Sequence, residues 1–106
     1  GFVAKANRVG ADIRIGDHGR YLGGAAVYGA SRLGDGSQIL GAITVDDCRL
    51  DGGGSHRHPD PDERAGLLKG AGVARGLVVR AGHVIVGAGA FRQADEEPQL
   101  NHHPRK

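Results

Sequence analysis

The histidines are the residues of this chain best suited to acid–base or metal chemistry. Six are present, and two of them flank an arginine in the segment His56-Arg57-His58. Neutral histidine is the commonest general base in proteins, and a carboxylate partner fixes its tautomer. A His-X-His pair can hold zinc together with a third ligand. His18 follows Asp17 in a turn position, and the alternative interpretation is that all these histidines are solvated turn and loop residues.

The remaining composition excludes several classes of protein. The single cysteine, Cys48, rules out an intrachain disulfide framework and a CxxC metal site, and it is expected to be a small buried residue. Fourteen basic against twelve acidic residues give a net charge of +2, so neither nucleic acid nor a membrane surface is expected as a partner. No stretch approaches the ~20 apolar residues of a membrane span, and no signal peptide is visible. We therefore expect a cytoplasmic protein.

The elements that must position these residues repeat every six residues. Eight successive positions six apart are all Val, Ile, Leu or Tyr: Val3, Val9, Ile15, Tyr21, Val27, Leu33, Ile39 and Val45. A second run in a shifted phase comprises Leu67, Val73, Val79, Ile85 and Phe91. A period of six fits neither an α-helix nor an alternating strand. It is typical of the hexapeptide β-helix, in which three hexads form one triangular coil.

The repeat predicts an all-β fold, a single-stranded parallel β-helix of about 4–5 coils, forming one domain over residues 1–106. The coils cover about residues 3–56 and 67–94, residues 52–66 form one protruding loop, and 95–106 form a tail. The chain has 20 glycines, and five of them fit the sharp corners: Gly10, Gly16, Gly34, Gly70 and Gly87. The inward columns are expected to be Val3, Tyr21 and Ile39; Val9, Val27 and Val45; and Ile15 with Leu33.

The tail from Arg92 to Lys106 contains no hexads and leaves two interpretations open. The acidic run Asp95-Glu96-Glu97 is able to start a short helix that caps the prism, whose end strands would otherwise have unpaired edges. The alternative is a solvated tail, to which His102 and His103 belong.

Three segments give the chain a resemblance to the hexapeptide-repeat acyltransferase superfamily, most closely to the serine acetyltransferases. They are Ser37-Gln38-Ile39-Leu40-Gly41-Ala42-Ile43-Thr44-Val45; the glycines 52–54 followed by Arg57-His58-Pro59; and 66–72 together with 86–90. The resemblance covers roughly residues 37–91. It implies a left-handed coil, a homotrimer with sites between protomers, and CoA-dependent O-acyl transfer to a serine or sugar hydroxyl, with acetyl-CoA as co-substrate.

The resemblance also implies roles for individual residues. His18 with Asp12 would form the catalytic pair, although their six-residue spacing puts them on neighbouring faces of the prism. Arg57 and His58 would bind the small-molecule acceptor. The acyl donor would contact Gly70, Ala71, Gly87, Ala88, Lys69 and Arg75, because small residues admit a narrow arm and cations neutralise phosphates. Arg80 is a further candidate for those phosphates.

Two alternative functions remain open at this point. The first is a carbonic anhydrase-like zinc protein on the same prism, which needs three converging histidines such as His56, His58 and His83; no metal is the first expectation. The second is a non-catalytic β-helix fragment that serves assembly. Zinc content and CoA binding separate these from the acyltransferase.

Overall fold

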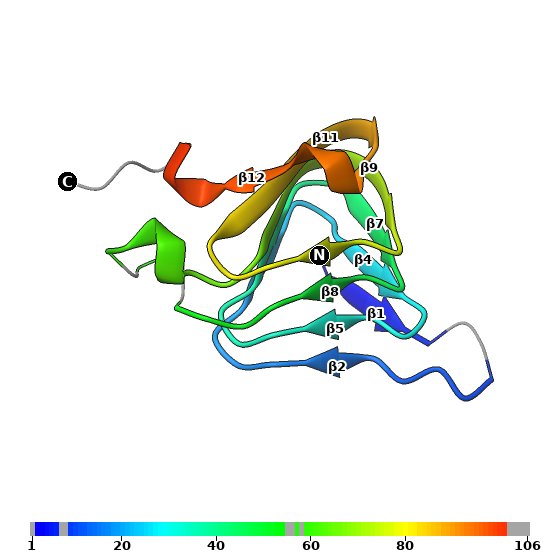
Figure 1. Ribbon diagram of the computed structural model, residues 1–106. Coiled ribbons are helices and arrows are strands. Elements are labelled where there is room, and N and C mark those ends of the chain that lie inside the picture. The colour runs from blue at the N-terminus through cyan, green and yellow to red at the C-terminus, as the bar shows by residue number, and fades with distance from the viewer. Residues whose placement is uncertain (1, 7–8, 55–56, 58, 102–106) are drawn as a thin grey trace.

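Short strands follow one another around the three faces of a prism in the computed structural model (Figure 1), which describes residues 2–6, 9–54, 57 and 59–101. These residues contain no α-helix. The strands are β1 (Val3–Lys5), β2 (Arg14–Ile15), β3 (Arg20–Leu22), β4 (Ala26–Tyr28), β5 (Arg32–Leu33), β6 (Gln38–Leu40), β7 (Ile43–Asp46), β8 (Arg49–Leu50), β9 (Leu67–Arg75), β10 (Val78–Val79), β11 (His83–Ala90) and β12 (Glu96–Pro98). The expected all-β class is therefore confirmed.

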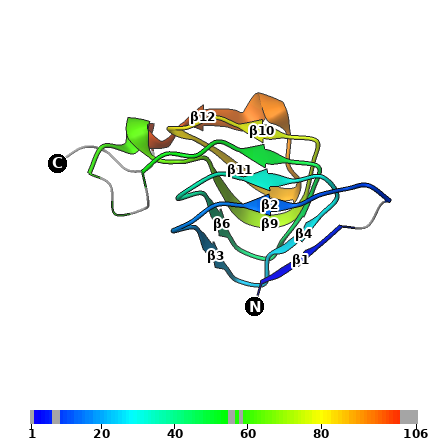
Figure 2. The same cartoon turned by 90° about the horizontal axis from the view of Figure 1, so that it is seen from below.

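Each face is a stack of parallel strands. One face consists of β2, β5, β8 and β10, the second begins with β1, β4 and β7, and the third begins with β3 and β6. The long strands β9 and β11 bend around the corner between the second and third faces. β9 pairs with β6 of the third face and with β7 of the second, and β11 pairs with β9 along its length. Figure 2 shows the prism from below, with β1 and β4 along one side and β3 and β6 along another. The chain thus returns to the same face once per coil.

The pairing register gives the length of each coil. Tyr21 pairs with Ile39 and Val27 with Val45, each eighteen residues apart, as three hexads predict. Leu33 pairs with Leu50, only seventeen residues away. This shortened coil explains why the hexad run ends: the apolar residue of the next coil is Leu50, one position before Asp51.

Two members of the predicted inward columns are wrong. Val3 is 57% exposed and pairs with Ala26, and Val9 lies fully exposed in the turn after β1. The pair Val3–Ala26 is 23 residues apart rather than eighteen, so the first coil has a longer connection that shifts the phase of β1.

The second hexad run is out of phase at its start. Leu68 and Ala74, not Leu67 and Val73, occupy the columns of Ile39 and Val45. Both are fully buried, and Val73 is 42% exposed. The inserted loop moves the repeat by one residue, and alternation along an extended strand then turns the neighbouring side chain inward.

The core is aliphatic, as the near absence of aromatic residues requires. Its columns are filled by Ile39, Leu68 and Ile85; Val27, Val45 and Ala74; and Leu33, Leu50 and Val79, all at most 2% exposed. Cys48 lies in a buried corner, where its sulfur is 3.4 Å from the carbonyl oxygen of Asp46 and 3.3 Å from that of Ala74, the two acceptors within reach of its single S–H. Burial raises the pKa of the Cys48 thiol above its ordinary value.

The loop between the third and fourth coils projects from the prism but is closed at its base. The Gly54 amide donates to the Glu63 carbonyl (2.7 Å), and the Gly66 amide donates to the Asp51 carbonyl (2.9 Å). A short 3₁₀ helix, η1 (Pro61–Glu63), lies inside the loop and is capped by the side chain of Asp60. Figure 1 shows this loop protruding beside the C-terminal segment.

Residues 93–101 cap the last coil with two 3₁₀ turns, η2 (Gln93–Asp95) and η3 (Gln99–Asn101), and the antiparallel strand β12. The predicted helix starting at Asp95-Glu96-Glu97 is wrong, because Glu96 and Glu97 pair with β11 as a strand. The Gln93 side chain both accepts from the Val78 amide (2.8 Å) and donates to its carbonyl (2.7 Å). It thereby replaces the missing neighbour of β10.

Candidate functional site

The corner at which β9 and β11 bend carries almost no side chains. Gly70 and Gly87 are in register there, and Gly41 occupies the equivalent corner one coil earlier. A Cβ on Gly41 would overlap the carbonyl oxygen of Gly70, and one on Gly70 would overlap that of Gly87. Both residues also have φ near +126°, a region that favours glycine. The close stacking of coils therefore requires glycine and leaves a bare corner on the outer surface.

Small and aliphatic residues line this bare corner on both sides. Ala71 and Ala88 are in register beside Gly70 and Gly87, and both are exposed. On the third face Val86 is 41% exposed, and on the second face Val73 is 42% exposed. The corner therefore offers an apolar surface that a narrow, flexible ligand arm is able to approach down to the backbone.

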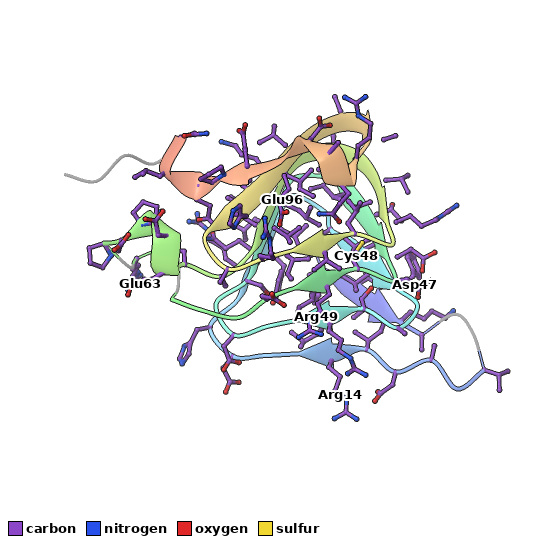
Figure 3. The ribbon with its side chains drawn as sticks, in the orientation of Figure 1. Arg14, Asp47, Cys48, Arg49, Glu63 and Glu96 are labelled. Atoms are coloured by element: carbon purple, nitrogen blue, oxygen red, sulfur yellow. The ribbon has the colours of Figure 1, made fainter. Side chains whose placement is uncertain are left out.

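One cation stands beside the corner. Lys69 precedes Gly70, is exposed, and forms no ion pair with any described residue. Arg75 lies at the far end of β9, where its Nε is 3.7 Å from Asp46 Oδ2. Arg80 contacts the C-terminal cap, because its Nη2 lies 3.3 Å from Oε1 of Glu96, a residue labelled in Figure 3. Of the three cations nominated for phosphates, Lys69 is thus next to the bare corner.

His18 is exposed in a constrained bend after β2. It has a left-handed backbone with φ of 60°. The bend is held on both sides of the peptide of Asp17: the Asp17 amide donates to Asp35 Oδ1, and the Gly36 amide donates to the Asp17 carbonyl, both at 2.8 Å. These two bonds fix the backbone conformation of the bend that carries His18.

Asp12 is not brought to His18. Asp12 lies two residues before Arg14, the first residue of β2. Its carboxylate accepts a hydrogen bond from the Arg14 side chain at 2.9 Å. The carboxylates on the His18 side of β2 are Asp17 and Asp35. Asp12 and His18, the proposed catalytic pair, therefore lie beyond opposite ends of β2.

The remaining nominated residues belong to the loop or are engaged elsewhere. Arg57 is exposed in a turn of the loop, whereas His56 and His58 lie outside the described residues. His83 Nδ1 is 3.0 Å from the Ala81 carbonyl oxygen. Over the described ranges no cluster of three His, Cys, Asp or Glu side chains is arranged to hold a metal.

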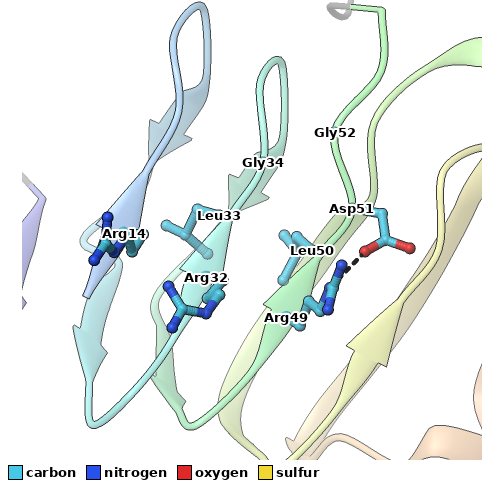
Figure 4. Close-up of a pocket in the computed structure, with 8 residues that line it drawn as sticks. All are labelled: Arg14, Arg32, Leu33, Gly34, Arg49, Leu50, Asp51 and Gly52. Atoms are coloured by element: carbon cyan, nitrogen blue, oxygen red, sulfur yellow. Dashed lines mark hydrogen bonds and ion pairs between the residues drawn. The ribbon is translucent and has the colours of Figure 1, made fainter. Parts of the chain in front are cut away.

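The structure also contains a column of arginines that the hexad analysis missed. Arg14, Arg32 and Arg49 are in register on β2, β5 and β8 and share one shallow hollow (Figure 4). Each directly precedes a member of one in-register aliphatic column, namely Ile15, Leu33 or Leu50. The sequence signal for this column is an arginine directly before the apolar position of successive coils. The period of eighteen does not find Arg49, because it lies only seventeen residues after Arg32.

Comparisons of the chain with protein-family models, curated proteins and solved structures found no match. Within the described residues, no helix has the length and apolar character that crossing a bilayer requires. The bare glycine corner, the His18 bend and the arginine column are therefore interpreted from their own chemistry.

Proposed function

We propose that this chain is the left-handed parallel β-helix of a CoA-dependent O-acyltransferase. The observation that carries the proposal is the bare corner formed by Gly41, Gly70 and Gly87. A pantetheine arm is narrow and mostly apolar, and it needs a surface without protruding side chains. The coil lengths of seventeen and eighteen residues fit the three-hexad geometry that the resemblance to these enzymes implies.

The acyl donor in this proposal lies along Ala71 and Ala88, between neighbouring copies of a homotrimer. Exposed Val73 and Val86 supply apolar contact, and Lys69 supplies charge toward the phosphate end of the donor. A second prism packed near this corner would enclose the arm. This accounts for aliphatic side chains that remain exposed on a single chain.

His18 is the proposed general base. Its imidazole takes the proton of the acceptor hydroxyl while that oxygen attacks the thioester carbonyl, and the thiolate of CoA leaves. Asp12 bonds Arg14, so it orients that arginine rather than the imidazole. Arg57 and His58 are the proposed acceptor contacts, and serine and small sugars are the first acceptors to screen.

The test is calorimetric titration of acetyl-CoA into the purified protein, with the oligomeric state measured by light scattering. We expect binding to a trimer. Ala88→Phe fills the bare corner at an exposed position and should abolish binding, whereas Ala81→Phe, an exposed alanine before β11, should not. A folded trimer that does not bind acetyl-CoA would overturn the proposal.

Catalysis is tested separately by His18→Asn, because asparagine tolerates a left-handed backbone. Removing a general base should slow acetyl transfer by about 10²- to 10⁴-fold and leave acetyl-CoA affinity unchanged. Unchanged transfer in this variant would remove His18 from the mechanism.

A non-catalytic assembly role is the second candidate, and the separation of Asp12 from His18 favours it. This role predicts stable oligomers with no affinity for acetyl-CoA. The same titration therefore decides between the two.

A further inference from the structure

The outer face of β2, β5 and β8 presents three arginines directly opposite one another. Arg32 pairs in register with Arg14 on one side and with Arg49 on the other. Neighbouring strands are about 4.8 Å apart, so the three side chains leave the sheet as an evenly spaced column. All three are exposed and line one shallow hollow together with Gly34 and Gly52 (Figure 4).

The two outer arginines are held by carboxylates, and the central one is not. Asp12 bonds Arg14 from two positions before it, and Asp51 bonds Arg49 from two positions after it, each at 2.9 Å. The corresponding positions around Arg32 are Ala30 and Gly34. Arg32 forms no ion pair with any described residue, so the middle of the column carries an uncompensated positive charge.

Like charges directly opposite on neighbouring strands destabilise a sheet. An exposed position on a strand accepts many residue types, so the fold does not require arginine there. An anion lying on the column would remove the repulsion. Gly34 and Gly52 also line the hollow, where a Cβ on Gly34 would meet the backbone of Gly52 in the next coil.

We propose that the column of Arg14, Arg32 and Arg49 binds a pyrophosphate group. One phosphoryl group lies between Arg14 and Arg32 and the other between Arg32 and Arg49, so the central guanidinium serves both. A guanidinium fork matches phosphoryl oxygens in a bidentate manner, which a lysine does not reproduce. Asp12 and Asp51 form ion pairs with the outer arginines, Arg14 and Arg49. In this proposal neither carboxylate lies between two arginines of the column.

This site lies on a different face from the bare glycine corner and does not depend on the proposed acyl transfer. The pyrophosphate has two sources: a free pyrophosphate or polyphosphate chain, or the diphosphate of a nucleotide-bearing molecule such as CoA. The chemistry at the arginines is the same for both.

The test is calorimetric titration of sodium pyrophosphate at low ionic strength into the wild-type protein and variants. Wild type should bind pyrophosphate more tightly than inorganic phosphate, with affinity that falls as salt rises. Arg32→Gln should weaken binding by about tenfold or more, the loss of charged hydrogen bonds at one residue. Arg32→Lys should recover only part of the loss. Arg20→Gln, an exposed arginine of β3 on another face, should bind as wild type does.

Equal weakening in Arg20→Gln and Arg32→Gln would overturn the site, as would binding of phosphate and pyrophosphate with equal affinity. Competition with CoA then assigns the source. If CoA displaces pyrophosphate and Arg32→Gln weakens CoA equally, the diphosphate belongs to the acyl donor. If CoA does not compete, the ligand is a free phosphate chain, and this result leaves the acyl-donor site to be judged by Ala88→Phe alone.

Discussion

The two ends of the prism are built differently, although the coils between them are alike. At the C-terminal end Gln93, Glu96 and Gln99 turn their side chains onto the last coil and satisfy its backbone groups. At the N-terminal end β1, β2 and β3 each pair with only one described strand. Figure 1 shows the cap over β11 and the uncovered edge of β2. One end is closed by the chain's own polar side chains, and the other presents open strand edges.

The exposure of side chains along one column differs between the two ends. Ile15, Leu33, Leu50 and Val79 are in register along one face, with exposed fractions of 42%, 2%, 1% and 0%. The same type of residue at the same position of the repeat is surface in the first coil and core in the later ones. Burial of a side chain in this stack therefore depends on what covers it on each side, a further coil for Leu33 and Leu50 or the C-terminal cap for Val79, more than on its own position in the hexad.

The largest expected loss of stability comes from truncating a buried side chain in the middle of this column. Leu50→Ala leaves a cavity in the buried stack and should reduce the free energy of unfolding by about 3 kcal/mol. Ile15→Ala, the matched control in the first coil, should cost under about 1 kcal/mol because its side chain is already partly exposed. Urea unfolding of both variants measures the difference, and equal costs would contradict the open N-terminal end.

The cap should show its contribution through Gln99. Its Nε2 donates to the carbonyls of Ala65 (2.6 Å) and His83 (2.9 Å), and its side chain is fully buried. Gln99→Ala strands those two carbonyls and should cost about 2 kcal/mol. Asn101→Ala, at an exposed position of the same turn, should be neutral in the same unfolding experiment.

Alkaline pH should lower the free energy of unfolding because the Cys48 thiol is buried. Burial raises the pKa of its thiol, so above the ordinary thiol pKa the unfolded chain releases a proton that the folded chain retains. Stability is therefore complete at neutral pH and falls as pH rises through the folded pKa. Cys48→Ala should flatten this decline in urea midpoints measured from pH 7 to pH 10. An equally steep decline in the variant would contradict the assignment.

Tyr21 adds a second alkaline contribution in the first coil. Burial raises the pKa of its phenol, and its hydroxyl lies 2.7 Å from Ser37 Oγ. Tyr21→Phe should reduce the loss of stability between pH 9 and pH 11 relative to wild type. An unchanged loss would mean that ionisation of this phenol does not oppose folding.

The smallest expected effect is a gain. Without ligand, Arg32→Gln removes the repulsion within the arginine column and should stabilise the protein by about 0.5 kcal/mol. Arg20→Gln serves as the control. Thermal melts in phosphate-free buffer measure the change, and destabilisation by Arg32→Gln would show that the column is held by contacts other than a ligand.

The sequence was sufficient for the parallel coil because period-six spacing is a strong constraint on an aliphatic core. It placed Tyr21 with Ile39 and Val27 with Val45 correctly. It failed where the coil length departs from eighteen, at Val3, Leu50 and Leu68, because a single inserted or deleted residue changes which side chain points inward. Local bulges of this kind depend on backbone contacts between coils, which a one-dimensional period does not contain.

Some of the candidate sites were also predictable from the sequence and others were not. The glycines at 70 and 87 were recognisable as a place of close approach, and the structure brings them into register. The arginine column was not found, because its third member lies seventeen residues from the second. The C-terminal cap was also unforeseen in its form. Side chains such as Gln93 imitate a strand edge through their amide groups, and this role has no local sequence pattern.

The in-register stack, closed at one end, underlies both the glycine corner and the arginine column. Amide hydrogen exchange measured for each residue tests this stack most directly, because three equivalent amides donate to the next coil. The Gly16 amide donates to the Leu33 carbonyl (2.7 Å), that of Gly34 to the Leu50 carbonyl (2.7 Å), and that of Asp51 to the Val79 carbonyl (2.9 Å). We predict protection that rises from Gly16 through Gly34 to Asp51. Equal protection of Gly16 and Asp51, or rapid exchange of Gly34 and Asp51, would contradict it.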